Sequence, residues 1–318
     1  MYNDAVTQNK LKNFKFPLLG YYFMNIGIIG TGLMGSAIAH RLIERGFKVF
    51  LYNRTKGRSD ALVKKGAIRM GHPSELGRKC NFVIISVTDG KAVKEMLFGD
   101  NGLVKSNNKR LIVVDTSTIL PEDSIYCASL MKKKGYAILQ APIMGGPDAT
   151  MKGDVITIIS GNKKIIEKSR RMLTSYSKKL FNLGNKDGAA NFIKLGLNLN
   201  IALIAISLAE SIVFVKKSKI DPAIFLEILN STYFKTGLSE IKGPKMIKNN
   251  FEPKFFLKNM LKDVQLLNES AKHNGTSLSF ASLAEQYFRI ASNRGYSELD
   301  YTAILKLFGE FNNLVSYR

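Results

Sequence analysis

Near its start the chain reads Met24-Asn-Ile-Gly-Ile-Ile-Gly30-Thr31-Gly32-Leu33-Met34-Gly35, a short apolar run that ends in Gly-x-Gly-x-x-Gly. An amphipathic helical pattern follows over residues 36–45. A strand, a tight glycine turn and a helix in this order form the site that holds a dinucleotide pyrophosphate. Gly30 permits the turn, and Gly32 lets the backbone approach the phosphates. Gly35 lets the helix pack against the strand, so that its N-terminal N–H groups face the negative charge. The sequence therefore predicts a dinucleotide-binding domain.

The residues after the second predicted strand, 47–52, indicate which dinucleotide is bound. Proteins that bind NAD carry an acidic residue here for the ribose 2′-hydroxyl, whereas this chain has Asn53, Arg54 and Thr55. Arg54 can stack on adenine or pair with a 2′-phosphate, which a carboxylate would repel. We therefore predict NADP in preference to NAD, with an ordinary basic surface turn as the alternative. Further candidate cofactor contacts lie in the glycine turn and at the end of the third predicted strand: Thr31, Leu33, Met34 and Val87.

The composition is that of a globular protein with an unusually basic balance. The 318 residues suffice for two domains with cores of their own, and 45% are apolar and 23% charged. The net charge of +22 is spread along the chain without a long basic run, which favours a solvated basic surface over nucleic-acid binding. Cys80 and Cys127 match no metal or redox spacing and are expected to be reduced thiols of a cytoplasmic protein. The three histidines are scattered, so we expect no metal site.

Two apolar segments raise the question of a membrane. Residues 1–23 are predicted to be an N-terminal extension with Met24 as the natural start, and their apolar part is too short to span a bilayer. The uncharged run 195–209 is also shorter than the roughly 20 residues that a span needs. A helix that is apolar on all sides is expected to be buried in the protein or at a subunit interface. We therefore predict no membrane segment, and a homodimer or homotetramer formed through the helical part of the chain.

Apolar, β-rich runs alternate with helical patterns from residue 25 to about residue 183. The runs cover 25–30, 47–52, 81–87, 110–115, 136–140, 155–160 and a stretch near 178–183. This alternation predicts an α/β fold with a Rossmann-type, doubly wound parallel sheet. Residues 189–216 then form one long helical pattern, roughly 42 Å long at 1.5 Å per residue, and helical patterns continue to the end. The predicted domains are a cofactor domain over 24–185 and an all-α domain over 186–318.

Two of the predicted strand ends carry groups that can bind a carboxylate. Ser117 and Thr118 follow a strand, at the edge where open α/β sheets bind ligands. They can equally serve as the N-cap of the next helix. Gly145 and Gly146 follow another strand and can leave their N–H groups exposed to an anion. A plain flexible loop is the alternative for these two glycines.

The start of the long helical pattern carries a polar stripe in apolar surroundings. The stripe consists of Asp187, Asn191, Lys194 and Asn198, which share one helix face at steps of four, three and four residues. A lysine in this setting either extends to solvent or is held in a site, where partial burial would lower its pKa. The periodicity alone leaves both interpretations open.

Together these segments resemble the β-hydroxyacid dehydrogenase family, which includes 3-hydroxyisobutyrate dehydrogenases and glyoxylate or succinic semialdehyde reductases. The resemblance covers about residues 25–310, and an ordered set of motifs carries it. These motifs are the glycine turn at 30–35, the segment 115–124, Gly145-Gly146, Lys194 with Asn198, and the segment 255–266 with Lys262-Asp263.

The resemblance implies an oxidoreductase that transfers hydride between NADP(H) and a short β-hydroxy acid or its semialdehyde. Lys194 would be the general acid and base, and Asn198 would hold the reacting oxygen. Lys262 would cover the cofactor, with Thr118 near it. The substrate carboxylate would bind at Ser117, Thr118, Gly145 and Gly146.

The chain departs from the family pattern at Met144, where the family often has Ser, and at Ala190, where it often has Gly. The thioether at Met144 removes a hydroxyl donor and favours a larger or less polar substrate tail. Two alternative functions remain open. One is a non-catalytic NADP-binding protein that docks on nucleic acid, in line with the net charge. The other is a sugar-acid dehydrogenase of the same superfamily, which the short helical part disfavours.

Overall fold

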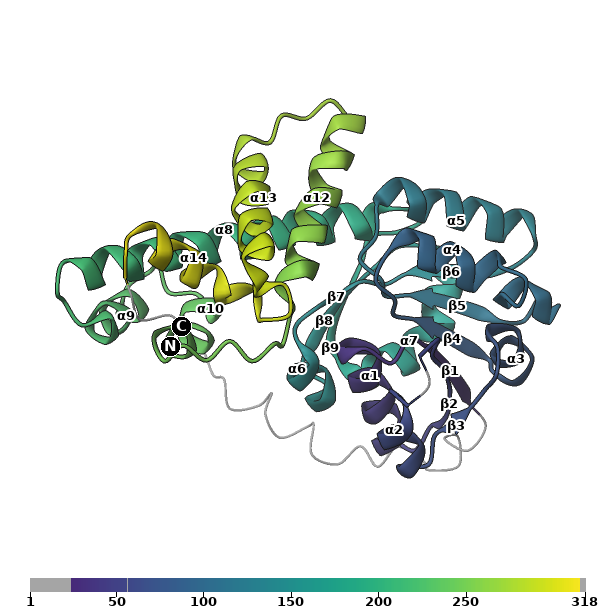
Figure 1. The fold of residues 1–318 in the computed structure, drawn as a ribbon. Helices are drawn as coiled ribbons and strands as arrows, with labels where there is room; N and C mark the ends of the chain where they lie inside the picture. The colour runs from purple at the N-terminus through teal and green to yellow at the C-terminus, as the bar shows by residue number, and fades with distance from the viewer. Residues whose placement is uncertain (1–23, 56, 315–318) are drawn as a thin grey trace, which may run out of the picture.

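The computed structural model describes residues 24–55 and 57–314, so the expectation about residues 1–23 lies outside the described residues. A sheet-containing domain and a helical domain lie side by side, and the long helix α8 (Ala189–Lys217) runs from one into the other (Figure 1). The predicted helix over 189–216 is thereby confirmed.

The first domain is built on a six-stranded, fully parallel sheet, which confirms the predicted Rossmann-type fold. Its strand order is β3-β2-β1-β4-β5-β6, the arrangement in which the chain reverses its direction of travel between β1 and β4. Ligands of such sheets bind at that point, beyond the carboxyl ends of the strands. The strands are β1 (Asn25–Ile29), β2 (Lys48–Tyr52), β3 (Ile68–Arg69), β4 (Phe82–Ile85), β5 (Ile112–Asp115) and β6 (Ala137–Gln140).

Helices cover both faces of this sheet, and this arrangement explains why its strands are apolar on both sides. One core contains Ile38 and Leu42 of α1 (Leu33–Glu44) together with Met172 of α7 (Lys163–Tyr176). A second core, against the opposite face, contains residues of α3 (Pro73–Lys79), α4 (Gly90–Phe98) and α5 (Pro121–Lys133). The remaining elements of this domain are α2 (Asp60–Lys64), the short 3₁₀ turn Leu103–Ser106 and α6 (Pro147–Lys152).

The structure corrects the expected placement of the last two strands. The runs 155–160 and 178–183 form β8 (Val155–Ile159) and β9 (Ser177–Asn182), which lie in a separate three-stranded sheet with β7 (Ile143–Met144). β7 is antiparallel to β8 because the chain reverses after β6, and an antiparallel bridge between Gln140 and Ser160 links the two sheets. β3 and β7 were not predicted, since two residues are too few to show an alternating pattern.

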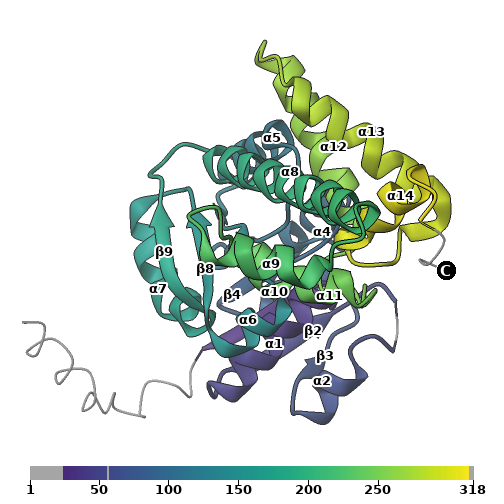
Figure 2. The ribbon, with the colours of Figure 1, turned by 90° about the vertical axis from the view of Figure 1, so that its left-hand side faces the viewer.

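The second domain is all-helical, as predicted. After α8 it contains α9 (Pro222–Ser231), α10 (Gly237–Ile241), α11 (Gly243–Ile247), α12 (Leu257–His273), α13 (Ser279–Ala291) and α14 (Ile304–Phe311). A π-helical turn (Ser292–Tyr296) and a 3₁₀ turn (Tyr301–Ala303) join α13 to α14. α8 lies between α9 on one side and the pair α12 and α13 on the other (Figures 1 and 2).

By length and composition alone, α8 could cross a membrane. Core helices have the same character. Ala202, Ala205, Ala209 and Ile212 of α8 are at most 1% exposed and belong to the core of the helical domain. Packing inside the protein therefore accounts for much of its apolar surface.

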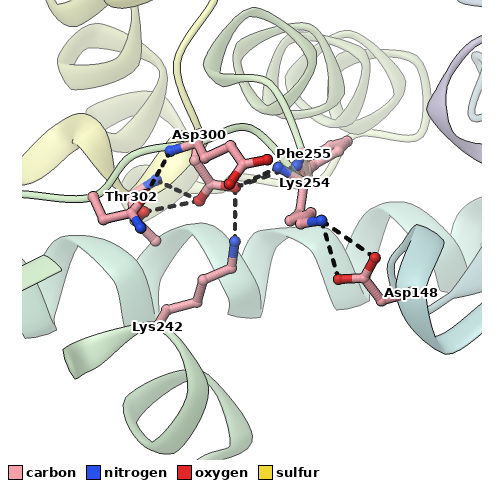
Figure 3. A network of polar contacts seen from close by, with 8 residues as sticks. Asp148, Lys242, Lys254, Phe255, Asp300 and Thr302 are labelled. Atoms are coloured by element: carbon pink, nitrogen blue, oxygen red, sulfur yellow. Dashed lines mark hydrogen bonds and ion pairs between the residues drawn. The ribbon is translucent and has the colours of Figure 1, made fainter. Parts of the chain in front are cut away.

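A buried carboxylate fastens the segment before α12 (Figure 3). Asp300 accepts a hydrogen bond from Lys242 Nζ at 2.7 Å and from the backbone N–H of Lys254 at 3.0 Å, and its other oxygen accepts from Thr302 Oγ1 at 2.8 Å. The Lys254 ammonium lies 3.2 Å from the carboxylate of Asp148 on α6. Because α6 belongs to the first domain, this network ties the two domains together.

Gly35 is the glycine whose replacement tests the packing of the first helix against the first strand. A methyl group added at Gly35 would lie 1.9 Å from the carbonyl oxygen of Gly30, so α1 must shift away from β1. We expect Gly35→Ala to lower stability by about 1–3 kcal/mol, a typical cost of overpacking, measured as a fall in the melting temperature. Gly32→Ala is the matched control, because no atom of the described residues lies within 4 Å of that added methyl. Equal melting temperatures for the two variants would contradict this account.

Candidate functional site

The glycine turn is locked to the neighbouring strand ends. Gly30 has a φ of +93°, and a methyl group there would lie 2.2 Å from the carbonyl oxygen of Ser86 after β4. The backbone N–H of Thr31 donates to Oδ1 of Asn53 at 3.0 Å, and the Asn53 amide donates to the carbonyl of Thr55 at 2.8 Å. Asn53 thus holds the turn against the end of β2.

The first turn of α1 is open to an anion. Gly32 is the N-cap and provides no capping side chain, and the first turn holds no acidic residue. No atom of residues 24–55 or 57–314 lies within 4 Å of the position where Gly32 would carry a side chain. Leu33 is exposed and Met34 is partly buried. Uncapped N–H groups at a positive helix end fit a dinucleotide pyrophosphate.

The basic residue predicted to select the cofactor lies beside this turn. Arg54 and Thr55 directly follow Asn53 and are exposed at the carboxyl end of β2. The side chain of Arg54 is therefore accessible to a ribose phosphate at the edge of the sheet where the glycine turn lies.

The loops after β4 and β5 are joined by hydrogen bonds. The backbone N–H of Val87 donates to Ser117 Oγ at 3.1 Å, and the N–H of Ser117 donates to Asp115 Oδ1 at 2.9 Å. Asp115 is only 4% exposed, and burial raises the pKa of its carboxyl to about 6, against the opposing effect of the hydrogen bonds from Ser117. Ser117 and Val87 are thereby fixed next to each other beside the glycine turn.

Lys194 is partly buried, and its ammonium contacts a sulfur atom. Its Nζ lies 3.1 Å from Sδ of Met144, the last residue of β7. Removal from water lowers the pKa of Lys194 to about 8; the carboxylate of Asp263 opposes this shift, and the ammonium of Lys262 adds to it. An amine with this pKa exists in both protonation states near neutrality, which suits a group that gives and takes a proton.

A buried carboxylate organises the groups around Lys194. Asp263 is 2% exposed, and its Oδ2 accepts a hydrogen bond of 2.6 Å from the amide of Asn198, itself 2% exposed. The Nζ of Lys262 lies 2.7 Å from Asp263 Oδ1 and donates to the carbonyl of Thr118 at 2.6 Å. The chain of contacts runs from α8 through α12 to the loop after β5, so it crosses from one domain to the other.

The paired glycines lie next to the residue that contacts Lys194. Gly145 and Gly146 follow Met144 directly and are exposed. Gly145 has a φ of +134°, and within the described part of the chain no atom lies within 4 Å of a methyl group added to Gly146. A ligand can therefore approach the backbone closely at this point.

Hydrogen bonds and close contacts thus link the segments of Ser117, Met144, Lys194, Asn198 and Lys262 where the two domains meet, and the polar stripe of α8 joins them with one exception. Asn191 of the stripe is buried, and its amide lies 3.5 Å from the carbonyl of Ser117. Asp187 precedes α8 and instead pairs with Lys132 at 2.6 Å. The polar stripe of the site therefore begins at Asn191.

Asp263 is the residue of this site to which the sequence analysis assigned no role. The sequence pattern of α12 could have indicated that Asp263 is buried. The buried positions of this helix include Leu257, Met260, Asp263 and Val264. These positions follow the three- and four-residue spacing of a helix face that packs on a core. An acidic residue on such a face must have a buried partner.

Comparison with known proteins gives the class and then the family. The model for the NAD binding domain of 6-phosphogluconate dehydrogenase matches residues 25–184. The model described as NAD-binding of NADP-dependent 3-hydroxyisobutyrate dehydrogenase matches residues 188–308. These matches define a nicotinamide-dinucleotide-dependent oxidoreductase. The chain belongs to the β-hydroxyacid dehydrogenase family.

Individual relatives agree with this assignment. The oxidoreductase YfjR of Bacillus subtilis is 31% identical, over 89% of this chain and 99% of the relative. The chloroplastic glyoxylate/succinic semialdehyde reductase 2 of Arabidopsis thaliana is 30% identical, over 89% of this chain and 79% of the relative. The solved structure of Psf3 in complex with NADP+ and 2-OPP shares the fold, with a TM-score of 0.82 at 22% identity, and covers 89% of this chain and 99% of that one.

Proposed function

We propose that this protein is an NADP(H)-dependent reductase and dehydrogenase that interconverts a short semialdehyde acid and the corresponding β-hydroxy acid. The observation that carries the proposal is the partly buried Lys194 amine, which contacts the Met144 sulfur and whose pKa is lowered to about 8 by removal from water. It lies on the same helix face as Asn198 and as Asn191, whose amide contacts the carbonyl of Ser117. Thr118 is held across the domain boundary by Lys262 of α12. The relatives' names point to the same chemistry.

A nicotinamide cofactor held at the glycine turn and Arg54 would supply a hydride to the carbonyl carbon of the substrate in the reductive direction. The Lys194 ammonium gives its proton to the carbonyl oxygen, which becomes the hydroxyl group, and the neutral amine then takes a proton from water. In the oxidative direction the neutral amine removes the hydroxyl proton. In this proposal Asn198 holds the reacting oxygen, and the hydrogen bond from its amide to Asp263 supports that role by fixing the side chain.

The same proposal places the substrate carboxylate at Ser117, Thr118, Gly145 and Gly146. The two glycines are exposed and follow Met144, whose sulfur contacts Lys194. A carboxylate at the glycines would therefore hold a short substrate with its carbonyl near the amine. Fixing the reacting groups in this way supplies much of the rate of such a reaction.

The role of Lys194 predicts both a rate loss and a pH profile. Lys194→Ala is expected to lower kcat by about 10²–10⁴, the usual contribution of a general acid or base, while cofactor binding is retained. For the wild type, reduction needs the ammonium, so kcat/KM for the aldehyde should fall as the pH rises above about 8. Oxidation needs the neutral amine, so its kcat/KM should rise with pH and level off above about 8.

Lys194→Arg is the matched control for this prediction, because it keeps the positive charge but cannot release a proton in this pH range. Equal losses in the arginine and alanine variants would support proton transfer as the role of the amine. Full turnover in either variant would rule that role out. Retained NADPH binding without wild-type turnover on any short semialdehyde would favour the non-catalytic alternative.

We infer that the cofactor is NADP rather than NAD. Asn53 has no negative charge and is occupied with the glycine turn, and Arg54 is exposed beside it. The guanidinium can pair with the 2′-phosphate that distinguishes the two cofactors.

The cofactor assignment is tested by changing this arginine. Arg54→Gln should raise the KM for NADPH about tenfold or more, since a charge-assisted hydrogen bond contributes roughly 1.5–3 kcal/mol, and should change the KM for NADH little. Arg78→Gln is the control, because Arg78 is an exposed arginine just before β4, at the opposite edge of the sheet. A wild-type preference for NADH would refute the assignment.

We also propose that the helical domain associates with a second copy of the chain. Its far end exposes large apolar side chains, which monomeric proteins seldom gather in one region. Four of them are 61–78% exposed: Phe214, Ile228, Phe234 and Ile241. A hollow with a volume of about 480 Å³ lies beside Phe214, between α8 and α9, and adds concave apolar surface. Self-association through one such surface gives a symmetric dimer.

Light scattering coupled to gel filtration tests this association. We expect the wild type to run as a dimer or tetramer and Phe214→Glu to shift toward the monomer, because the new charge would be buried in the contact. Tyr126→Glu is the control, since Tyr126 is an exposed aromatic residue on α5 of the other domain. A monomeric wild type at micromolar concentration would end the proposal.

The cytoplasm remains our proposed compartment. Cys80 and Cys127 are free and buried, and burial raises the pKa of each thiol to about 12. Unpaired thiols of this kind are typical of proteins kept in a reducing compartment.

A further inference from the structure

The amine of Lys194 faces a thioether, and this contact bears on which substrates the site accepts. Met144 Sδ lies 3.1 Å from Lys194 Nζ, and the Met144 side chain is only partly buried. A thioether accepts hydrogen bonds weakly and donates none. The Met144 side chain therefore forms an apolar wall of the site beside the reacting amine.

The position of this wall relative to a substrate follows from the proposed function, on which the inference rests. The reacting oxygen must lie about 2.6–3.2 Å from the amine that protonates it. That oxygen and the sulfur thus neighbour the same nitrogen atom. The proposed carboxylate position, at Gly145 and Gly146, comes directly after Met144 in the chain. The carbon that joins the carbonyl to the carboxylate therefore passes the Met144 side chain.

We propose that Met144 selects semialdehyde acids whose α-carbon carries hydrogen or an alkyl group, and discriminates against those with a hydroxyl group there. A methyl substituent would make dispersion contacts with the thioether. A hydroxyl group pressed against the same surface would lose its hydrogen bonds to water without replacing them. The substrate class is thus an unsubstituted or alkyl-substituted β-hydroxy acid rather than a polyhydroxylated sugar acid.

Two stable acids that differ by one group provide the test. They are 3-hydroxy-2-methylpropionate and 2,3-dihydroxypropionate, which exchange a methyl for a hydroxyl at the α-carbon. We would measure kcat/KM for the oxidation of each with NADP+, and the Kd of each for the enzyme–NADP+ complex by calorimetry. The wild type should favour the methyl compound by about 10- to 100-fold, the range in which an apolar pocket discriminates.

Two variants then assign the preference to this side chain. Met144→Ser places a hydroxyl group on the wall and should reduce the preference at least about tenfold. Met144→Leu keeps the wall apolar at similar volume and should preserve the preference. Melting temperatures of both variants separate a change in selectivity from a loss of packing, because a packing role alone would move stability and leave the ratio unchanged.

The outcomes separate this inference from the proposed function. Equal Kd values for the two acids in the wild type, or an unchanged ratio in Met144→Ser, would overturn the role of Met144. A collapse of the ratio in Met144→Leu as large as in Met144→Ser would overturn it as well, as would failure of both acids to bind. Binding of the methyl compound with the expected preference but no turnover would uphold the selectivity and refute the catalytic proposal.

Discussion

The carboxylate of Asp263 is the interaction on which the candidate site depends. It is nearly inaccessible to water, and it holds the Asn198 amide of one helix and the Lys262 ammonium of another. A buried charge of this kind is tolerable only with close partners, so removing Lys262 would leave the carboxylate without an opposite charge at a substantial energetic cost. Because Lys262 also reaches the carbonyl of Thr118, the same charge fixes the helical domain against the sheet edge. The geometry of the site and the packing of the two domains therefore both depend on the Asp263 carboxylate.

The two lysines of this region have opposite surroundings, and this contrast suits different tasks. Lys262 lies between a carboxylate and a carbonyl oxygen, and both oxygens stabilise its positive charge. The ammonium of Lys194 instead lies 3.1 Å from the sulfur of Met144, and removal from water lowers the pKa of Lys194. Its neighbour Lys262 adds to that effect while Asp263 limits it. An ammonium that stays fixed can position ligands, whereas an amine with a pKa of about 8 can exchange a proton.

The sequence predicted the parts of the fold that depend on local order. The glycine turn lies between a strand and a helix within a dozen residues, and the close approach of Gly35 to Gly30 shows why glycine is needed there. The long helix α8 was equally clear, because its pattern is continuous. The placement of β8 and β9 in a second sheet was not predictable, since it depends on a chain reversal after β6 that involves only two paired residues of β7.

The surroundings of Lys194 show the limit of sequence reasoning at the site itself. Helical spacing placed the lysine on a face with Asn191 and Asn198, but it could not decide between a solvent-exposed and an enclosed amine. The deciding contacts come from Met144, 50 positions earlier in the chain, and from the α12 helix, whose Asp263 is 65 positions after Asn198. α8 carries this amine near its start and Phe214 twenty residues later, roughly 30 Å away at 1.5 Å per residue. A partner that contacted only the Phe214 end of α8 would therefore lie far from the Lys194 amine.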